Sequence, residues 1–182
     1  MTCIVGIEAY GKVIMGSDGC ASDGYHKYEV DEPKLFIKNE ILFGYTTSFR
    51  FADIIQYHVN IVNHSEGKAD KQYLVEDVVP EIRKKLKDHG FVENDKGRES
   101  GGTALIGYKD KLYILQDDFS IIRNKIGYAS CGSGTYVAYG SLHTTQSLLD
   151  IPPEQRILLA LKAAADHSVG VSEPFHVWWN KL

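Results

Sequence analysis

Apolar positions in the first quarter of the chain are grouped in short runs, with the length and alternation that strands favour. Four of these runs are expected to pair as two hairpins, 2–9 with 13–18 and 34–37 with 41–45. The first pair is joined at Tyr10-Gly11, a dipeptide suited to a tight turn. Residues 19–31 are rich in Gly, Ser, Asp and Tyr, and we expect a loop or an irregular extension there. The N-terminal part of the chain is therefore predicted to be sheet.

The pattern then changes to helical spacing. Ser48 is a suitable N-cap, and apolar residues recur at helical intervals from 51 to 62 and again from 74 to 86. The polar stretch 63–71 separates the two patterns and is expected to be a loop. Pro80 interrupts the second pattern, so we expect either a kink or a helix that restarts with Pro80 in its first turn.

Strands are predicted to return in the second half of the chain. A charged, glycine-containing segment, 91–102, is expected to be a linker. The strands expected after it are 103–108, 112–116, 121–123 and 128–131. Two helices, 135–149 and 153 to about 168, and a closing strand, 175–179, complete the chain.

The order of these elements predicts the fold class. Strands, two helices, strands, two helices and a last strand come in blocks, which disfavours a doubly wound sheet with alternating helices and strands. Two packed sheets with a helix pair on each outer face would bury every apolar face. We therefore expect an α+β fold, a four-layer αββα sandwich, formed by residues 1–182 as one domain of 20.4 kDa.

Composition narrows the possible functions. The chain is 43% hydrophobic, as globular proteins are, and its 20 Lys+Arg against 24 Asp+Glu leave no basic footprint for nucleic acid. The basic cluster at 83–87 is interpreted as a solvated helix face. No apolar run approaches the roughly 20 residues of a membrane span, and charges at Glu8 and Lys12 interrupt any signal-peptide core. Three cysteines without framework spacing indicate a reducing cytoplasm.

Candidate chemistry lies in the first 34 residues. Thr2 follows the initiator Met1, Asp18 ends the second expected strand, and Lys34 precedes the third. If a cytosolic methionine aminopeptidase removes Met1, the α-amine of Thr2, with a pKa of roughly 8, can accept the proton of its own hydroxyl. Lys34 would lower the pKa of that amine by charge repulsion, and Asp18 would pair with Lys34. Each residue alone also fits an ordinary structural role: Thr2 as part of a strand, Asp18 as part of a turn, and Lys34 as a solvated surface charge.

The spacing of these residues is characteristic. Asp18 stands in Gly16-Ser17-Asp18-Gly19, and Lys34 follows sixteen residues later. In this the chain resembles the proteasome-type N-terminal nucleophile hydrolases, most of all the HslV-type peptidase subunits of bacteria and related proteins of bacteria and phages. The similarity continues through 43–48 and 132–134, and weakly to Asp166. It covers most of the chain, although only the N-terminal motif is specific. The four-layer sandwich is also what the resemblance implies.

The resemblance implies further site residues. Ser133 and Asp166 would orient the Thr2 amine, and the backbone N–H of Thr47 would stabilise the oxyanion. Thr46 and Thr47 stand where glycines are common in the family, and an ST-rich helix start explains them equally well. Ser133 suits an N-cap for the next helix as well as it suits the site. The serine expected three positions after Asp166 is replaced by Val169.

The resemblance predicts a threonine endopeptidase that hydrolyses unfolded polypeptides through an acyl-enzyme on Thr2. It would form a homo-oligomeric ring, receive substrate from an ATP-dependent unfoldase, and work in the cytoplasm without nucleic acid or membrane. We expect no cofactor and no metal, because Gly132-Ser133-Gly134 lacks the Lys-Ser/Thr of a phosphate loop and the histidines and cysteines lack ligand spacing. Two alternatives stay open: an inactive structural or regulatory subunit of the same fold, and a small-molecule amidase of the same superfamily.

Overall fold

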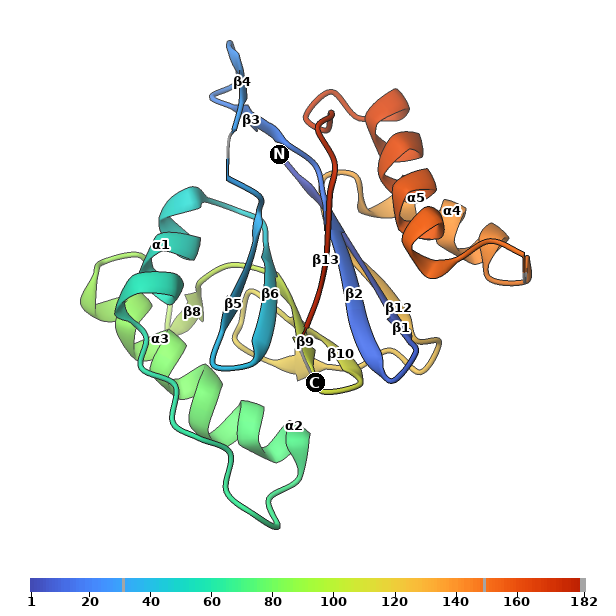
Figure 1. Cartoon of the computed structure of the whole chain (residues 1–182). Helices are drawn as coiled ribbons and strands as arrows, with labels where there is room; N and C mark the ends of the chain where they lie inside the picture. Colours follow the sequence, from blue (N-terminus) through green and yellow to red (C-terminus); the bar gives the residue numbers. More distant parts are fainter. Residues whose placement is uncertain (31, 149, 181–182) are drawn as a thin grey trace.

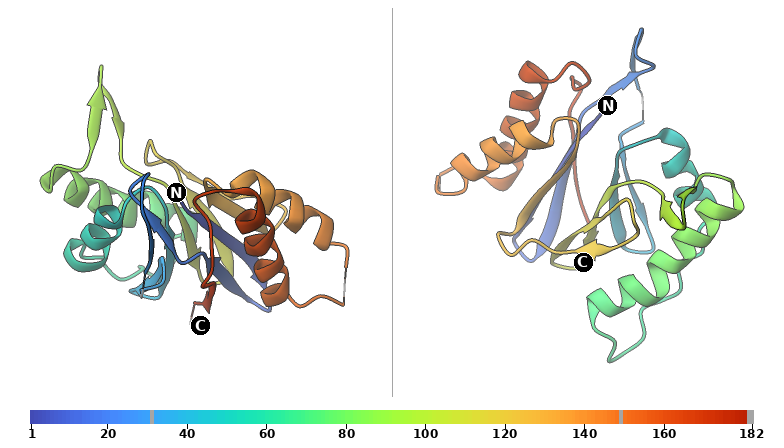
Figure 2. Two further views of the ribbon diagram at one scale, coloured as in Figure 1. Left: turned by 90° about the horizontal axis from the view of Figure 1, so that it is seen from above. Right: turned by 180° about the vertical axis from the view of Figure 1, so that it is seen from behind.

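Two β-sheets lie face to face, and a layer of helices covers the outer face of each (Figure 1). The computed structural model of the chain describes residues 1–30, 32–148 and 150–180. The predicted four-layer α+β sandwich is confirmed, and the views from above and from behind show the helices kept to the two outer faces (Figure 2). No helix in these ranges is long and apolar enough to cross a membrane.

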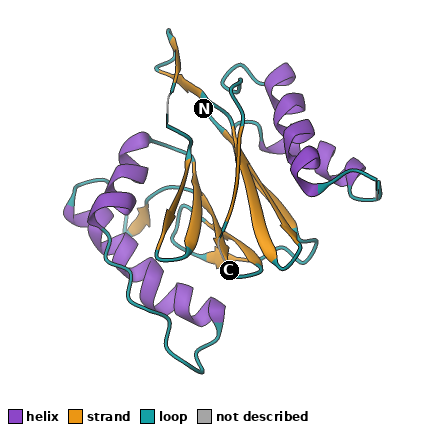
Figure 3. Ribbon diagram, in the orientation of Figure 1, coloured by secondary structure: helices purple, strands orange, loops and turns teal. Residues whose placement is uncertain are grey.

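Both sheets are antiparallel throughout (Figure 3). The four-stranded sheet has the order β12-β1-β2-β13, and these strands span Tyr128–Gly132, Cys3–Ala9, Lys12–Ser17 and His176–Trp179. The five-stranded sheet has the order β11-β10-β9-β6-β5, and these strands span Ile121–Ile122, Lys111–Leu115, Ala104–Tyr108, Ile41–Tyr45 and Leu35–Lys38. The predicted hairpins are therefore β1–β2 and β5–β6.

The apolar run of β1 is explained by burial on both of its faces. Cys3, Val5 and Ile7 point toward the helix layer, whereas Ile4 points into the layer between the two sheets. Successive side chains of a strand alternate between its faces, so a strand covered on both sides has apolar residues almost throughout. This central strand is the element that carries Thr2 at its beginning.

Helices α1 (Phe49–His58), α2 (Asp70–Tyr73) and α3 (Val79–Asp88) cover the five-stranded sheet. Ser48 is the N-cap of α1, as predicted, and accepts a hydrogen bond from the Arg50 N–H at 3.1 Å. The helix ends at His58, before the predicted limit of 62. Between α2 and α3 the chain forms one π-helical segment, Leu74–Val78, and Pro80 lies in the first turn of α3. Proline has no N–H to donate to the preceding turn, and the helical backbone continues past Pro80 without a break because the π-helical segment precedes it.

Helices α4 (Thr135–Thr145) and α5 (Pro153–His167) cover the four-stranded sheet. Two segments differ from their predictions. The expected loop at 19–31 contains a hairpin of β3 (Cys20–Ser22) and β4 (Lys27–Glu29), and the expected linker at 91–102 contains a hairpin of β7 (Glu93–Asp95) and β8 (Arg98–Ser100). Both are closed by a side chain that accepts backbone N–H groups, Asp23 in the first and Asn94 in the second.

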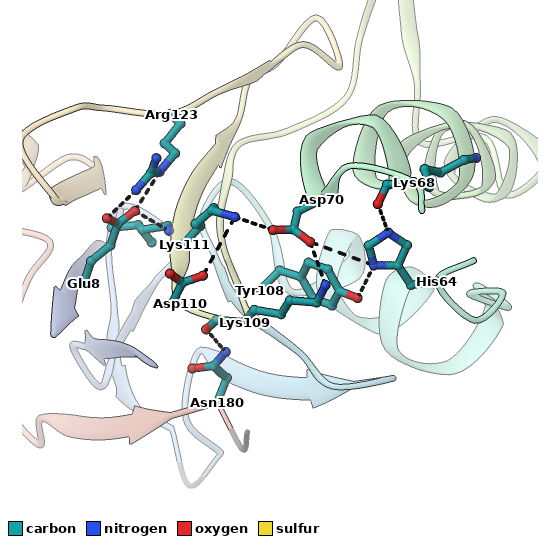
Figure 4. A network of polar contacts seen from close by, with 11 residues as sticks. Glu8, His64, Lys68, Asp70, Tyr108, Lys109, Asp110, Lys111, Arg123 and Asn180 are labelled. Atoms are coloured by element: carbon teal, nitrogen blue, oxygen red, sulfur yellow. Dashed lines mark hydrogen bonds and ion pairs between the residues drawn. The ribbon is translucent and has the colours of Figure 1, made fainter. Parts of the chain in front are cut away.

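A polar network closes the end of the sandwich opposite the beginning of the chain (Figure 4). Asp70, in the first turn of α2, binds the ammonium groups of Lys109, at 2.7 Å, and Lys111. Asn180 donates to the Lys109 carbonyl and accepts the Val13 N–H at 2.8 Å. These contacts connect helix α2, the β9–β10 turn and the last described residue. They lie at the end of the sandwich opposite the one at which the chain begins.

Candidate active site

The site lies where the two sheets meet, at the end of the sandwich marked N in Figure 1. Thr2 precedes β1, Asp18 follows β2 and Ser133 follows β12, so the four-stranded sheet supplies all three. Lys34 precedes β5 and Thr47 follows β6, so the five-stranded sheet supplies the other two. Strand ends from both sheets therefore bring together five residues that are far apart in sequence.

Thr2 is buried, at 7% exposure, and its backbone is held by Ser133. The Thr2 nitrogen donates to Ser133 Oγ at 3.1 Å, and Ser133 Oγ also reaches the Thr2 carbonyl at 3.2 Å. Gly132 permits this approach, because its φ is +101° and a Cβ there would lie 2.2 Å from the Thr2 oxygen. The N-cap of α4 is Gly134, without a side-chain bond. Ser133 therefore does not have the capping role that its sequence also allowed.

Asp18 and Lys34 form a fully buried ion pair. Their exposures are 0% and 1%, and Lys34 Nζ lies 3.0 and 2.9 Å from the two carboxylate oxygens. Asp18 also accepts the N–H groups of Cys3, at 2.8 Å, and Cys20, at 3.0 Å, while the Cys20 carbonyl accepts from Lys34. Every polar atom of the pair is thus satisfied, which a buried ion pair requires. The same carboxylate fixes the backbone directly after Thr2.

A small pocket of about 90 Å³ opens beside Thr2. Met1, Thr2 and Lys34 line it, together with Tyr45 and Thr47. Thr47 has a φ of +72°, a conformation that is unusual for a β-branched residue. In the part of the chain that the structure describes, no backbone hydrogen bond uses the Thr47 N–H. The residues that line this pocket therefore include one with a hydroxyl, Thr2, one with a buried ammonium group, Lys34, and one whose N–H has no backbone partner among the described residues, Thr47.

Cys3, next to Thr2, does not compete as a nucleophile. Burial raises the pKa of its thiol to about 12, although the hydrogen bond with the Ser130 side chain acts to lower that pKa. Since only a thiolate is strongly nucleophilic, the thiol stays protonated at neutral pH. The hydroxyl of Thr2 lies against the preceding residue, where Oγ1 donates a hydrogen bond to the Met1 carbonyl at 2.6 Å. The peptide bond before Thr2 is therefore in direct contact with the side chain of Thr2.

Asp166 lies apart from the residues that hold Thr2. Its side chain is 57% exposed and pairs with Lys162 at 3.6 Å, one helical turn earlier in α5. Among the hydrogen bonds of the described residues, none joins Asp166 to Thr2 or Ser133. Val169 is 97% exposed. The structure thus brings together Thr2, Asp18, Lys34, Thr47 and Ser133 and places Asp166 on the surface.

Gly170 is a residue of the site that its sequence does not reveal. A Cβ built on Gly170 would lie 2.0 Å from the Met1 Cβ and 2.7 Å from its Sδ. The Met1 side chain therefore occupies the space left by the missing side chain of Gly170. A lone glycine after a helix is most simply a helix terminator, so only the folded structure connects it to Met1.

Comparison with known proteins gives a likeness in structure alone. No protein-family model matches the chain, and no curated protein matches it in sequence. Among solved structures, BPH of Thiobacillus denitrificans in complex with epoxomicin is similar over 99% of this chain and 98% of its own, with a TM-score of 0.82 and 16% identity.

Two further solved structures are similar over most of their length. HslV of Trypanosoma brucei has a TM-score of 0.72 and 16% identity, and the match covers 97% of this chain and 98% of that one. Anbu, an ancestral β-subunit, from Yersinia bercovieri has a TM-score of 0.68 and 12% identity, with 98% and 81% covered. At these identities the likeness concerns the fold.

Proposed function

We propose that this chain, which has the fold of the proteasome-type N-terminal nucleophile hydrolases, is a threonine peptidase subunit that becomes active when Met1 is removed. The observation that carries this proposal is the 3.1 Å hydrogen bond from the Thr2 nitrogen to Ser133 Oγ. Once Met1 is gone, that nitrogen is a free amine, already oriented and adjacent to its own hydroxyl. No histidine or metal is needed to generate the nucleophile.

The reaction would proceed through an ester on Thr2. The neutral amine takes the hydroxyl proton as Oγ1 attacks the carbonyl carbon of the scissile amide. The C–N bond then breaks, and the proton passes from the Thr2 ammonium to the leaving nitrogen. A water molecule attacks the ester with the amine again acting as base, and Oγ1 recovers its proton as the acid product leaves. Atoms and protons balance over the cycle.

Three neighbours would support these steps. Lys34 lines the same pocket as Thr2, and the charge of its ammonium group favours the neutral form of a nearby amine. Asp18 fixes that ammonium and balances its charge. The Thr47 N–H, which has no backbone partner among the described residues, is available to donate to the oxyanion, and a positioned donor of this kind contributes about 2.7–4 kcal/mol to catalysis in a studied hydrolase.

The first test combines processing with activity. We expect the mass of the isolated protein to be lower than the encoded mass by one methionine residue. Thr2→Ala should reduce hydrolysis of denatured-protein substrates by about 10³-fold or more, because the nucleophile is lost. Thr2→Ser is the matched control, since it keeps a hydroxyl at the same place and should keep measurable activity. Hydrolysis that survives Thr2→Ala would rule out this mechanism.

The same experiment separates the alternatives. A protein that keeps Met1 and hydrolyses nothing is the inactive subunit, because the amine is then part of a peptide bond. Hydrolysis of small acyl amides but not of peptides would identify an amidase. Epoxomicin, which is bound in the structure of Thiobacillus denitrificans BPH, provides a second readout. It should raise the melting temperature of the processed wild type more than that of Thr2→Ala.

The proposal extends to assembly and substrate. We infer a homo-oligomeric ring in the cytoplasm that encloses the sites and receives unfolded polypeptide from an ATP-dependent unfoldase. Support comes from the fold shared with HslV and with an ancestral β-subunit. Native mass spectrometry gives the number of copies directly, and a monomeric native mass would contradict the ring.

A further inference from the structure

The chain makes a tight turn around Thr47. The Ser48 N–H donates to the Thr46 carbonyl at 2.8 Å, and the residue between them, Thr47, has a φ of +72°. A hydrogen bond of this span across a residue with positive φ defines a γ-turn of the rare, strained form. The Thr46 carbonyl is therefore used within the turn, directly after the last residue of β6.

Thr103, directly before β9, lies opposite this turn. Its carbonyl accepts the Thr46 N–H at 3.1 Å, which extends the pairing of β6 with β9 by one bond. In an antiparallel pair the reciprocal bond would run from the Thr103 N–H to the Thr46 carbonyl. Instead, the Thr103 N–H donates to Thr47 Oγ1 at 3.3 Å. The side-chain oxygen of Thr47 thus takes the place of the carbonyl that the turn has used.

The hydroxyls of Thr46 and Thr47 complete a ring of hydrogen bonds. Thr46 Oγ1 lies 3.0 Å from the Thr103 carbonyl and is the donor there, because a carbonyl only accepts. It also lies 3.4 Å from Thr47 Oγ1, and since a hydroxyl has one hydrogen, Thr47 is the donor in that contact. The bonds therefore run from the Thr103 N–H through both hydroxyls to the Thr103 carbonyl.

The N–H of Thr47 stays outside this ring. It has no backbone partner among the described residues, and Thr47 lines the small pocket that Thr2 also lines. A backbone that needs a positive φ is formed without strain by glycine, so backbone conformation alone does not account for a threonine at 47. The ring of hydrogen bonds does account for it, because glycine would leave the Thr103 N–H without the oxygen that it contacts here.

We propose that the hydroxyls of Thr46 and Thr47 are positioning groups for the oxyanion. By closing the ring with the Thr103 peptide, they hold the strained turn in one conformation and so fix the Thr47 N–H. A donor of this kind assists the reaction when it is oriented before the charge develops. This inference rests on the proposed function, and it adds two side chains that act through one backbone group.

The test measures kcat and KM of the processed protein on an internally quenched peptide that contains a bond cleaved in denatured protein. Thr47→Val keeps the branched shape but breaks the ring. We expect kcat to fall about tenfold or more while KM stays within about twofold, because an oxyanion donor acts in the transition state. Thr47→Ser keeps the oxygen and should retain kcat within about threefold.

Thr47→Gly separates the ring from the backbone conformation. It relieves the strain of the positive φ and removes the hydroxyl, so we expect kcat to fall about tenfold, as in Thr47→Val. Hydrogen exchange followed by mass spectrometry provides a readout independent of activity. The segment that contains Thr103 should exchange faster in both variants than in the wild type or Thr47→Ser, because its N–H has lost its acceptor.

A double-mutant cycle tests whether the two hydroxyls act as one ring. Thr46→Val combined with Thr47→Val should reduce kcat little more than Thr47→Val alone, because the ring is already broken. Thr144→Val is the matched control, since its hydroxyl bonds only within the exposed face of α4, and it should leave kcat unchanged. Melting curves confirm that each variant is folded.

The outcomes distinguish this inference from the proposed function. Wild-type kcat in Thr47→Val or Thr47→Gly, a loss expressed in KM alone, equal losses in Thr47→Val and Thr47→Ser, or additive losses in the cycle would overturn the positioning ring while the peptidase stands. A wild type that is inactive on denatured protein would overturn both.

Discussion

Lys34 shows how far a single residue can depend on its surroundings. Its ammonium group is withdrawn from water and is held by both oxygens of Asp18 and by a backbone carbonyl. A lysine is almost never this buried without a partner. Its sequence neighbours, Pro33 and Leu35, do not predict burial, and only its register with Thr2 and Asp18 indicated a role.

Asp18→Asn should therefore be strongly destabilising. The substitution leaves the Lys34 charge buried without a counter-charge, and breaking such a pair costs about 3–5 kcal/mol. Urea denaturation of the processed protein measures the loss directly. Asp166→Asn is the control for an exposed pair, which contributes at most about 1 kcal/mol. A loss for Asp18→Asn as small as that of the control would contradict the buried pair.

Thr47 shows where sequence and backbone conflict. The resemblance predicted a glycine-like position there, and the residue present is threonine. The structure keeps the glycine-like backbone, with a φ of +72°, although a residue in such a region costs about 1–3 kcal/mol. Its Oγ1 accepts the Thr103 N–H at 3.3 Å, which offsets part of that cost. A strained conformation kept beside the candidate nucleophile is consistent with a role for its N–H.

At the scale of elements, the sequence predicts the strands and helices that bury one or both faces, because burial gives them a regular hydrophobic pattern. The central strands and the long helices have buried faces, so their periodicity was visible. Strands β4 and β7 are exposed throughout and β8 has no buried residue, so only β3, with Cys20 and Ala21, is buried in these hairpins. Neither hairpin has an apolar alternation, which is why the sequence predicts a loop and a linker there. Helix α1 ends early because Val59, although buried, adopts an extended backbone. Such boundaries depend on tertiary contacts that no local pattern records.

The β7–β8 hairpin is fastened to helix α3 by charge. Glu99 accepts hydrogen bonds from Arg83 and from Lys87, at 3.1 Å, which lower its pKa from 4.5 to about 2. The sequence predicted a solvated basic face at 83–87, but in the structure two of its residues, Arg83 and Lys87, pair with Glu99. Since Arg83 and Lys87 lie on the helix and Glu99 on the strand, the contact ties two elements together.

This contact predicts a specific response to acid. A carboxyl whose pKa is lower in the folded state contributes stability above its unfolded pKa, and that contribution disappears as pH falls from about 4.5 to about 2. Glu99→Gln should therefore lose less stability than the wild type over that interval. Urea denaturation at several pH values checks the slope, and parallel curves for the two proteins would exclude a contribution from Glu99.

At the scale of the whole molecule, the site exists only because the two sheets are packed together. One sheet carries Thr2, Asp18 and Ser133, and the other carries Lys34 and Thr47. The layer between the sheets is made of buried apolar side chains from both. Any change in that packing alters the distance between the nucleophile and the ammonium group.

Leu42→Ala tests this dependence. Leu42 is fully buried between the sheets, and truncating such a leucine costs about 2–5 kcal/mol in unfolding free energy. We also expect turnover to fall, since the two halves of the site shift relative to each other. Leu158→Ala is the control, because Leu158 is 41% exposed on α5. Full activity in a destabilised Leu42→Ala protein would show that the site is independent of the inter-sheet packing.

The two chain ends marked in Figures 1 and 2 lie at opposite ends of the sandwich. Thr2 lies in the candidate site, whereas Asn180 donates a hydrogen bond to the Lys109 carbonyl in the β9–β10 turn. An affinity tag or reporter fused in front of Thr2 would have to pass through the space beside Gly170 and would keep the amine acylated. Such a fusion should be purified inert, while the same fusion at the other end should leave the amine free. The choice of expression vector would thus decide whether activity is seen at all.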